Sequence, residues 1–108
     1  MNVVTLMELR EPPHPSRAAI LPVVRYAVER KIAKGKPDYW DYASLLELAT
    51  VELNETQARD ALQKARALVR ETWEPKTTER NLRLLRETRE RRGLVQPWML
   101  EVEKELME

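Results

Sequence analysis

Apolar residues recur along the chain at spacings of three and four, which is the period of an α-helix. Basic segments run into Gly35 and Gly93, and Pro37 and Pro97 follow within a few residues. This order is typical of a helix end, because cations complement the terminal carbonyls and glycine readily adopts the left-handed conformation that ends a helix. The pattern therefore predicts several helices in series.

Residues that cap helices mark where these helices begin. We expect five, starting at Ser16, Asp38, Asn54, Thr77 or Thr78, and Pro97. Gln57 lies at capping-box spacing from Asn54, and Asp41 adds negative charge to the turn after Asp38. Pro22 lies inside the first helix, where its missing N–H predicts a kink or a restart.

The first fifteen residues follow a different pattern. Val3–Met7 is the only β-like stretch, and it has no partner strand. Glu11–Pro15 is rich in proline, and residues before proline avoid helical angles. The sequence therefore predicts an all-α fold, a compact bundle of about five helices, with an extended arm over 1–15 and a single domain over 16–108.

Composition limits the chemistry that the chain can perform. Its 108 residues include 19 basic and 18 acidic side chains, one histidine, two glycines and no cysteine. Thiolate nucleophiles and cysteine–metal sites are absent, and the few glycines leave no phosphate-binding loop. No apolar run approaches the ~20 residues that span a membrane. We expect a cytoplasmic protein that uses no cofactor and no metal.

The remaining candidate catalytic groups have simpler interpretations. His14 lies in the proline-rich segment, where a solvated loop histidine is favoured over a member of a triad. Asp38 and Asp41 are spaced for an acid–base or metal pair, but helix capping explains them equally well. Glu47 lies in an apolar stretch and predicts a structural ion pair with an arginine of the fourth helix. We therefore expect no enzymatic activity.

Three tryptophans provide candidate anchors. Trp40, Trp73 and Trp98 each lie near a predicted helix start or junction, where tryptophan usually locks one helix against another. Interfaces are also rich in tryptophan, and if one of the three contacts a partner instead, we expect it to be Trp98.

The predicted fourth helix carries a cluster of arginines. Arg80, Arg83 and Arg86 are candidate phosphate contacts for a nucleic acid. However, Arg83 and Arg86 are also spaced for ion pairs with glutamates of the same helix, and the net charge of the chain is only +1. A solvated surface of salt bridges is therefore favoured.

Two segments carry a resemblance to known helical proteins. Leu53–Ala58, with Leu62 and Ala65, is similar to the second helix of a tetratricopeptide repeat, although Leu53 stands where the repeat usually has glycine. Together with the Tyr39–Trp40 helix start and the run Asn81–Leu85, the chain over about Ile20–Leu106 resembles the helical TRAF-binding domain of apoptosis-signal-regulating kinases and its bacterial relatives. The resemblance implies a regulatory or scaffolding segment that binds proteins.

The leading hypothesis is a non-catalytic adaptor or regulatory domain that binds a protein partner in an unassigned pathway. The helices leave room for a homodimer as well. The alternative is a nucleic-acid-binding module that uses Arg80, Arg83 and Arg86.

Overall fold

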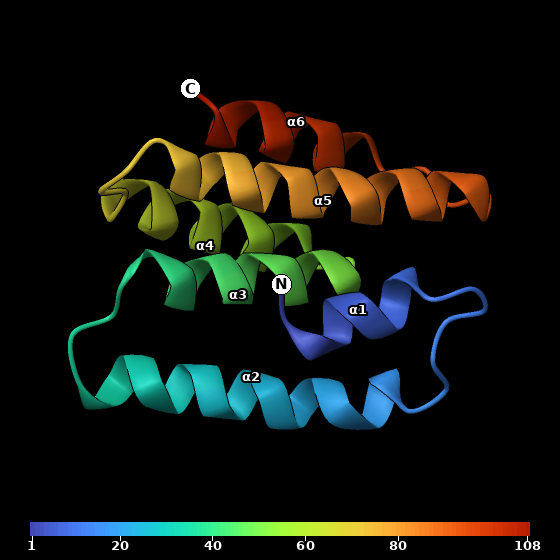
Figure 1. The fold of residues 1–108 in the computed structure, drawn as a ribbon, viewed down its shortest axis with the longest axis horizontal. Coiled ribbons are helices and arrows are strands. Elements are labelled where there is room, and N and C mark those ends of the chain that lie inside the picture. Colours follow the sequence, from blue (N-terminus) through green and yellow to red (C-terminus); the bar gives the residue numbers. More distant parts are fainter.

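The computed structural model describes residues 1–108 and contains six α-helices and no β-strand. The helices are α1 (Val3–Leu9), α2 (Arg17–Lys34), α3 (Tyr39–Val51), α4 (Glu55–Ala67), α5 (Trp73–Arg91) and α6 (Pro97–Leu106) (Figure 1). The predicted all-α fold is confirmed, with one helix more than expected.

An antiparallel hairpin of α3 and α4 forms the middle of the molecule, and these two helices contact each other more extensively than any other pair (Figure 1). On one side, α1 and α2 pack on α3; on the other, α5 packs on α3 and α6 packs on α4 and α5. As a result, α2 and α6 lie at opposite edges of the molecule (Figure 1).

The apolar core is divided into two main clusters. The larger joins α3, α4, α5 and α6 and consists of Leu46, Ala49, Ala58, Ala61, Leu62, Leu82, Trp98, Met99, Val102 and Leu106. Its alanines let α3 and α4 approach closely. The smaller cluster ties α1 and α2 to α3 and α5 through Val4, Leu21, Leu48, Val51 and Leu85. The core therefore extends to the first helix of the chain.

The extended arm predicted for residues 1–15 is wrong over Val3–Leu9, which form α1. The Asn2 side chain caps this helix by accepting a hydrogen bond from the Thr5 N–H at 2.9 Å. The buried side of α1 consists of Val4, Thr5 and Glu8. Because two of these three residues are polar, the apolar periodicity that reveals other helices is missing here.

Four of the five predicted helix starts are confirmed, including that of α6 at Pro97, and one is wrong. Asp38 and Asp41 form a complete capping box for α3, and the Asn54 side chain accepts from the Gln57 N–H at 3.1 Å to cap α4. Ser16 makes no side-chain cap, although α2 begins beside it. The start predicted at Thr77 or Thr78 is wrong, because α5 begins at Trp73.

Prolines and glycines behave differently at different positions. Pro75 lies in the first turn of α5, where its missing N–H costs little because first-turn amides have no helical partner. α2 continues through Pro22 without a break. Gly93 ends α5 with a φ of 84°, in the left-handed region that favours glycine, whereas Gly35 ends α2 without entering it.

Candidate interaction surface on α5

Polar contacts along the inner side of α5 fix which of its residues face solvent. The Tyr39 hydroxyl donates to Thr78 Oγ1 at 2.8 Å, and burial raises the pKa of Tyr39 to about 12. Further along, Asn81 Nδ2 donates to Glu47 Oε2 at 3.1 Å. Near the end of the helix, Arg89 donates to Glu8 and to the Thr50 carbonyl, both at 2.9 Å. These contacts determine the rotation of α5 about its axis.

Glu47 is buried without the arginine partner that the sequence predicts. Its carboxylate accepts from Thr5 Oγ1 at 2.9 Å, from Asn2 Nδ2 at 3.2 Å and from Asn81 Nδ2. The inward arginine of α5 is Arg89 instead, and it pairs with Glu8 of α1. The predicted ion pair of Glu47 is therefore wrong, and hydrogen bonds from three neutral side chains replace it.

The start of α5 is held by a buried carboxylate. Glu74 Oε1 accepts from the backbone N–H of Arg70 at 2.8 Å and of Glu71 at 3.0 Å. These hydrogen bonds, that of Arg70 first, lower the pKa of Glu74 below its usual value. Beside it, the Trp73 ring lies 5.7 Å from the Trp40 ring, centroid to centroid. Trp73 is thereby fixed in place and still 56% exposed.

The outer side of α5 combines apolar and cationic residues. Trp73, Thr77, Arg80 and Leu84 are spaced by four, three and four, which places them on one side of the helix. All four are exposed, and Arg80 forms no ion pair. We refer to these four residues as the α5 stripe.

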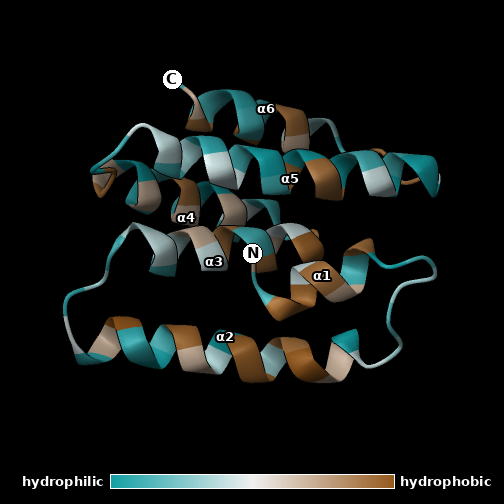
Figure 2. Ribbon diagram, viewed as in Figure 1, coloured by the Kyte–Doolittle hydropathy of each residue, from teal (hydrophilic) through white to brown (hydrophobic).

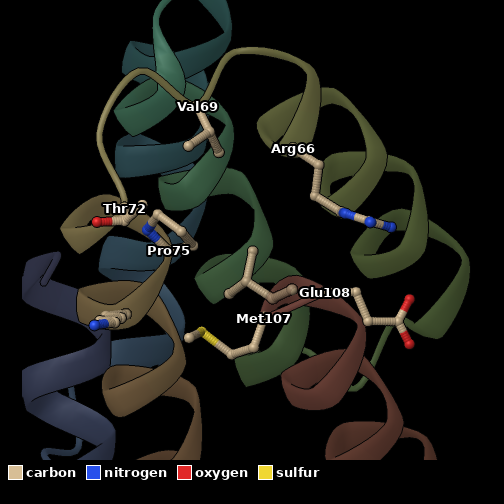
Figure 3. Close-up of a pocket in the computed structure, with 8 residues that line it drawn as sticks. Arg66, Val69, Thr72, Pro75, Met107 and Glu108 are labelled. Carbon is tan, nitrogen blue, oxygen red and sulfur yellow. The ribbon is translucent and has the colours of Figure 1, made fainter.

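A pocket of about 520 Å³ opens beside the start of α5, between the ends of α4 and α6. Val69, Pro75 and Met107 approach its opening from three segments of the chain (Figure 3). Arg66 and Lys76 add positive charge to its lining. Its lining is half apolar and half polar or charged, and it includes the negative charge of Glu108.

The structure buries the tryptophan that the sequence selects as the partner contact. Trp98 is 8% exposed, lies in the larger core cluster and donates its indole N–H to Gln96 Oε1 at 3.1 Å. Little of its ring is left for a partner. The exposed tryptophan is Trp73, and its spacing to Arg80 and Leu84 is the signal that could have identified it.

Only one of the three candidate arginines is free of acidic partners. Arg83 lies 3.6 Å from Glu79 and 3.8 Å from Glu87, as its spacing predicts.

Arg86 forms closer contacts, at 2.8 Å to Glu90 and 2.6 Å to Glu103. The hydrogen bond to Glu103 is the main reason that the pKa of Arg86 is raised. The structure therefore assigns Arg83 and Arg86 to ion pairs, and Arg80 alone lacks an acidic partner.

The other candidate groups occupy structural positions. Asp41 completes the α3 cap and pairs with Lys31 at 2.8 Å. Burial opposes ionisation of Asp41, but hydrogen bonds from Lys31 and from the Asp38 backbone outweigh it and lower the pKa of Asp41. His14 Nδ1 accepts from the Ser16 N–H at 3.1 Å in the loop before α2. No three acidic or histidine side chains gather in a way that could hold a metal ion.

These features define a small helical domain whose exposed apolar and cationic residues form surfaces suited to contact with another molecule. None of its helices is both long and apolar enough to cross a membrane. The chain matches the family described as the MAP3K TRAFs-binding domain over residues 1–103, and it belongs to that family. No curated protein and no solved structure matches the chain.

Proposed function

We propose that the chain is a non-catalytic adaptor or regulatory domain that binds a protein partner through the α5 stripe. Membership of a family named for binding TRAFs supports a protein as the partner. The observation that carries the choice of surface is Trp73, a large aromatic side chain that is exposed and yet held in position by Trp40. Rigid aromatic anchors beside an arginine are typical of binding hot spots.

The chemistry of the stripe also suggests what the partner presents. Trp73 and Leu84 would cover an apolar patch, while Arg80 between them would meet a carboxylate. The pocket lined by Pro75 and Lys76 lies beside the start of α5 and would accept a projecting side chain of the partner. The ion pairs of Arg83 and Arg86 leave no observation that favours a nucleic acid.

Capture of partners from the source lysate on immobilised protein tests this proposal, with and without nuclease. We expect one or more proteins to be retained after nuclease treatment and lost from Trp73→Ala and Arg80→Glu variants. Thr56→Ala, on the exposed side of α4, is a matched control that should retain the same proteins. Material that disappears on nuclease treatment, or equal retention by all variants, would refute the proposal.

A further inference from the structure

α2 carries apolar residues on two opposite sides, and only one side is covered. Ile20, Leu21 and Val24 pack against the smaller core cluster. On the opposite side, Val23 is 64% exposed and Tyr26 is 63% exposed. Figure 2 shows that apolar residues extend along α2 at the edge of the molecule, with no further helix beyond it. Apolar residues that recur on one side of a helix normally pack against another element, so the outer side of α2 lacks a partner.

This outer side is cationic as well as apolar. Ala19, Val23, Tyr26, Arg30 and Lys34 follow one another at spacings of four, three, four and four, which places them on one side of the helix. We refer to these five residues as the α2 stripe. Its first half is apolar and its second half is basic. Neither Arg30 nor Lys34 forms an ion pair, whereas Lys31 on the neighbouring side pairs with Asp41.

An ordinary solvated helix of this protein has a different surface. The exposed side of α4 is polar, and its charges satisfy each other: Arg59 pairs with Glu55 at 2.8 Å and Lys64 pairs with Asp60 at 2.9 Å. The α2 stripe contains no acidic residue that could do the same. Beside its basic half lies an open depression of about 560 Å³ lined by Tyr26, Arg30 and Lys34 among others.

We propose that the α2 stripe binds an acidic amphipathic helix of another protein. The apolar side of that helix would cover Val23 and Tyr26, and its carboxylates would pair with Arg30 and Lys34. Charge complementarity carries the choice, because the cations of the stripe have no acidic partner within the chain; Arg30 donates only to the Tyr26 hydroxyl, at 3.1 Å. The inference extends the proposed function by adding a second surface and naming the chemistry of its partner.

The dimensions of α2 and the charges elsewhere on the chain favour this occupant over a second copy. The 18 residues of α2 extend over about 27 Å, which matches one partner helix of about five turns. If a second copy bound through its own α2, its cations would face Arg30 and Lys34. If it bound through its exposed α5–α6 side, that side would bring Arg80, Arg83 and Lys104 against them. Neither surface supplies unpaired acid groups in the number that the α2 stripe requires.

Two synthetic helical peptides of 18 residues provide the probe. Both carry leucine and alanine along one side; the first has glutamates and the second has lysines at the flanking positions. Fluorescence anisotropy should show that the full chain binds the glutamate peptide and not the lysine peptide. Because ion pairs at an exposed surface are screened, raising the salt should weaken this binding.

Variants of the stripe make the test specific. Val23→Asp should weaken binding of the glutamate peptide by about tenfold or more, since it places a charge in the apolar contact. The double variant Arg30→Glu, Lys34→Glu should reverse the preference and bind the lysine peptide. Val95→Asp, at an exposed apolar residue before α6, is the matched control and should bind as the parent chain does. Circular dichroism should show unchanged helix content for all of them.

Each contrary result has a definite meaning. No binding of the glutamate peptide, equal binding of both peptides, or an unreversed preference in the double variant overturns the inference. Binding to phosphatidylserine vesicles that is lost in the double variant, without peptide binding, identifies a lipid surface instead. A concentration-dependent dimer that Val23→Asp abolishes identifies a second copy. Arg80→Glu should leave peptide binding intact, so a failure at α2 is separable from a failure of the α5 proposal.

Discussion

At the scale of single residues, the turn between α3 and α4 contains a backbone conformation that its side chain disfavours. Leu53 has a φ of 59°, in the left-handed region, where a side chain with a Cβ crowds the following carbonyl. The resemblance to a tetratricopeptide repeat indicates glycine at this position, and the structure shows why glycine suits it. The three residues of this turn let α3 and α4 lie antiparallel.

Leu53→Gly should therefore stabilise the protein. Relief of the left-handed conformation contributes about 1–2 kcal/mol, and the greater freedom of glycine in the unfolded chain removes roughly 0.5–1 kcal/mol. We expect a net gain of about 0.5–1 kcal/mol, measured by urea unfolding. Leu53→Ala, which keeps the Cβ, is the control and should show no gain. A loss in the glycine variant would mean that the partly exposed Leu53 side chain contributes more by packing than the backbone loses.

Tyr39 provides a second test at a single residue. Its hydroxyl donates to Thr78, so Tyr39→Phe should cost about 1 kcal/mol near neutral pH. The pKa of Tyr39 is raised from 10.0 to about 12, mainly by burial, so the unfolded chain loses this proton first. Stability should therefore fall as the pH rises from about 10 to about 12. The decrease in the free energy of unfolding at alkaline pH should be smaller in Tyr39→Phe. An identical decrease in both proteins would mean that ionisation of Tyr39 is not its cause.

At the scale of helices, sequence reasoning succeeds where local signals set the boundary. Asp38, Asn54 and Pro97 are residue types that begin helices, and α3, α4 and α6 begin beside them. The start of α5 escapes this reasoning because Glu74 satisfies the amides of the preceding residues from inside the helix. Thr72 directly precedes Trp73 and is of a capping type, but its side chain makes no cap hydrogen bond.

The carboxylates at the starts of α3 and α5 predict how the protein responds to acid. The pKa values of Asp41 and Glu74 are lowered from 3.8 and 4.5, so both groups favour the folded state while ionised. Their contribution is complete above these values and is lost as the pH falls through the lower pKa values of the folded state. Glu103 acts in the opposite sense, because burial raises its pKa.

Comparison with a variant isolates this effect. Asp41→Asn combined with Glu74→Gln should lower the melting temperature near pH 7 and flatten its decrease below about pH 4. Thermal unfolding by circular dichroism between neutral and acidic pH measures both. Glu87→Gln on the exposed side of α5 should leave the curve unchanged. If the melting temperature of the double variant fell as steeply at acidic pH as that of the parent chain, the carboxylates at the two helix starts would not be the cause of this fall.

At the scale of the molecule, long-range contacts decide what the local pattern leaves open. Trp98, Val102 and Leu106 are spaced by four and lie together on one buried side of α6. Burial of Trp98 depends on how α6 packs on α4 and α5, whereas the spacing of Trp73 to Arg80 and Leu84 is the local signal for the exposed tryptophan. Arg80 differs from Arg83 and Arg86 in having no acidic partner, and this difference follows from the rotation of α5 that Tyr39 and Asn81 fix.

The position of α1 is also set by the whole molecule. Its Val4 is fully buried, and its polar residues serve groups far along the chain: Thr5 donates to Glu47, and Glu8 pairs with Arg89. Without α1, both Glu47 and Arg89 would lose partners in a buried environment. Removal of one member of a buried charge pair typically costs about 3–5 kcal/mol.

Deletion of residues 1–10 should therefore destabilise the remaining domain strongly, whereas an extended arm could be removed without effect. We expect a loss of more than about 3 kcal/mol, because the unpaired Arg89 and the lost burial of Val4 act together. For a domain of this size the melting temperature should fall by roughly 15 °C or more.

Leu6→Ala, on the exposed side of α1, is the matched control and should change the melting temperature little. An unchanged melting temperature in the truncated chain would show that the contacts of Glu8 and Thr5 add nothing to folding. If the melting temperature falls strongly and Arg89→Met in the truncated chain partly restores it, the unpaired buried cation is the principal cause of the loss.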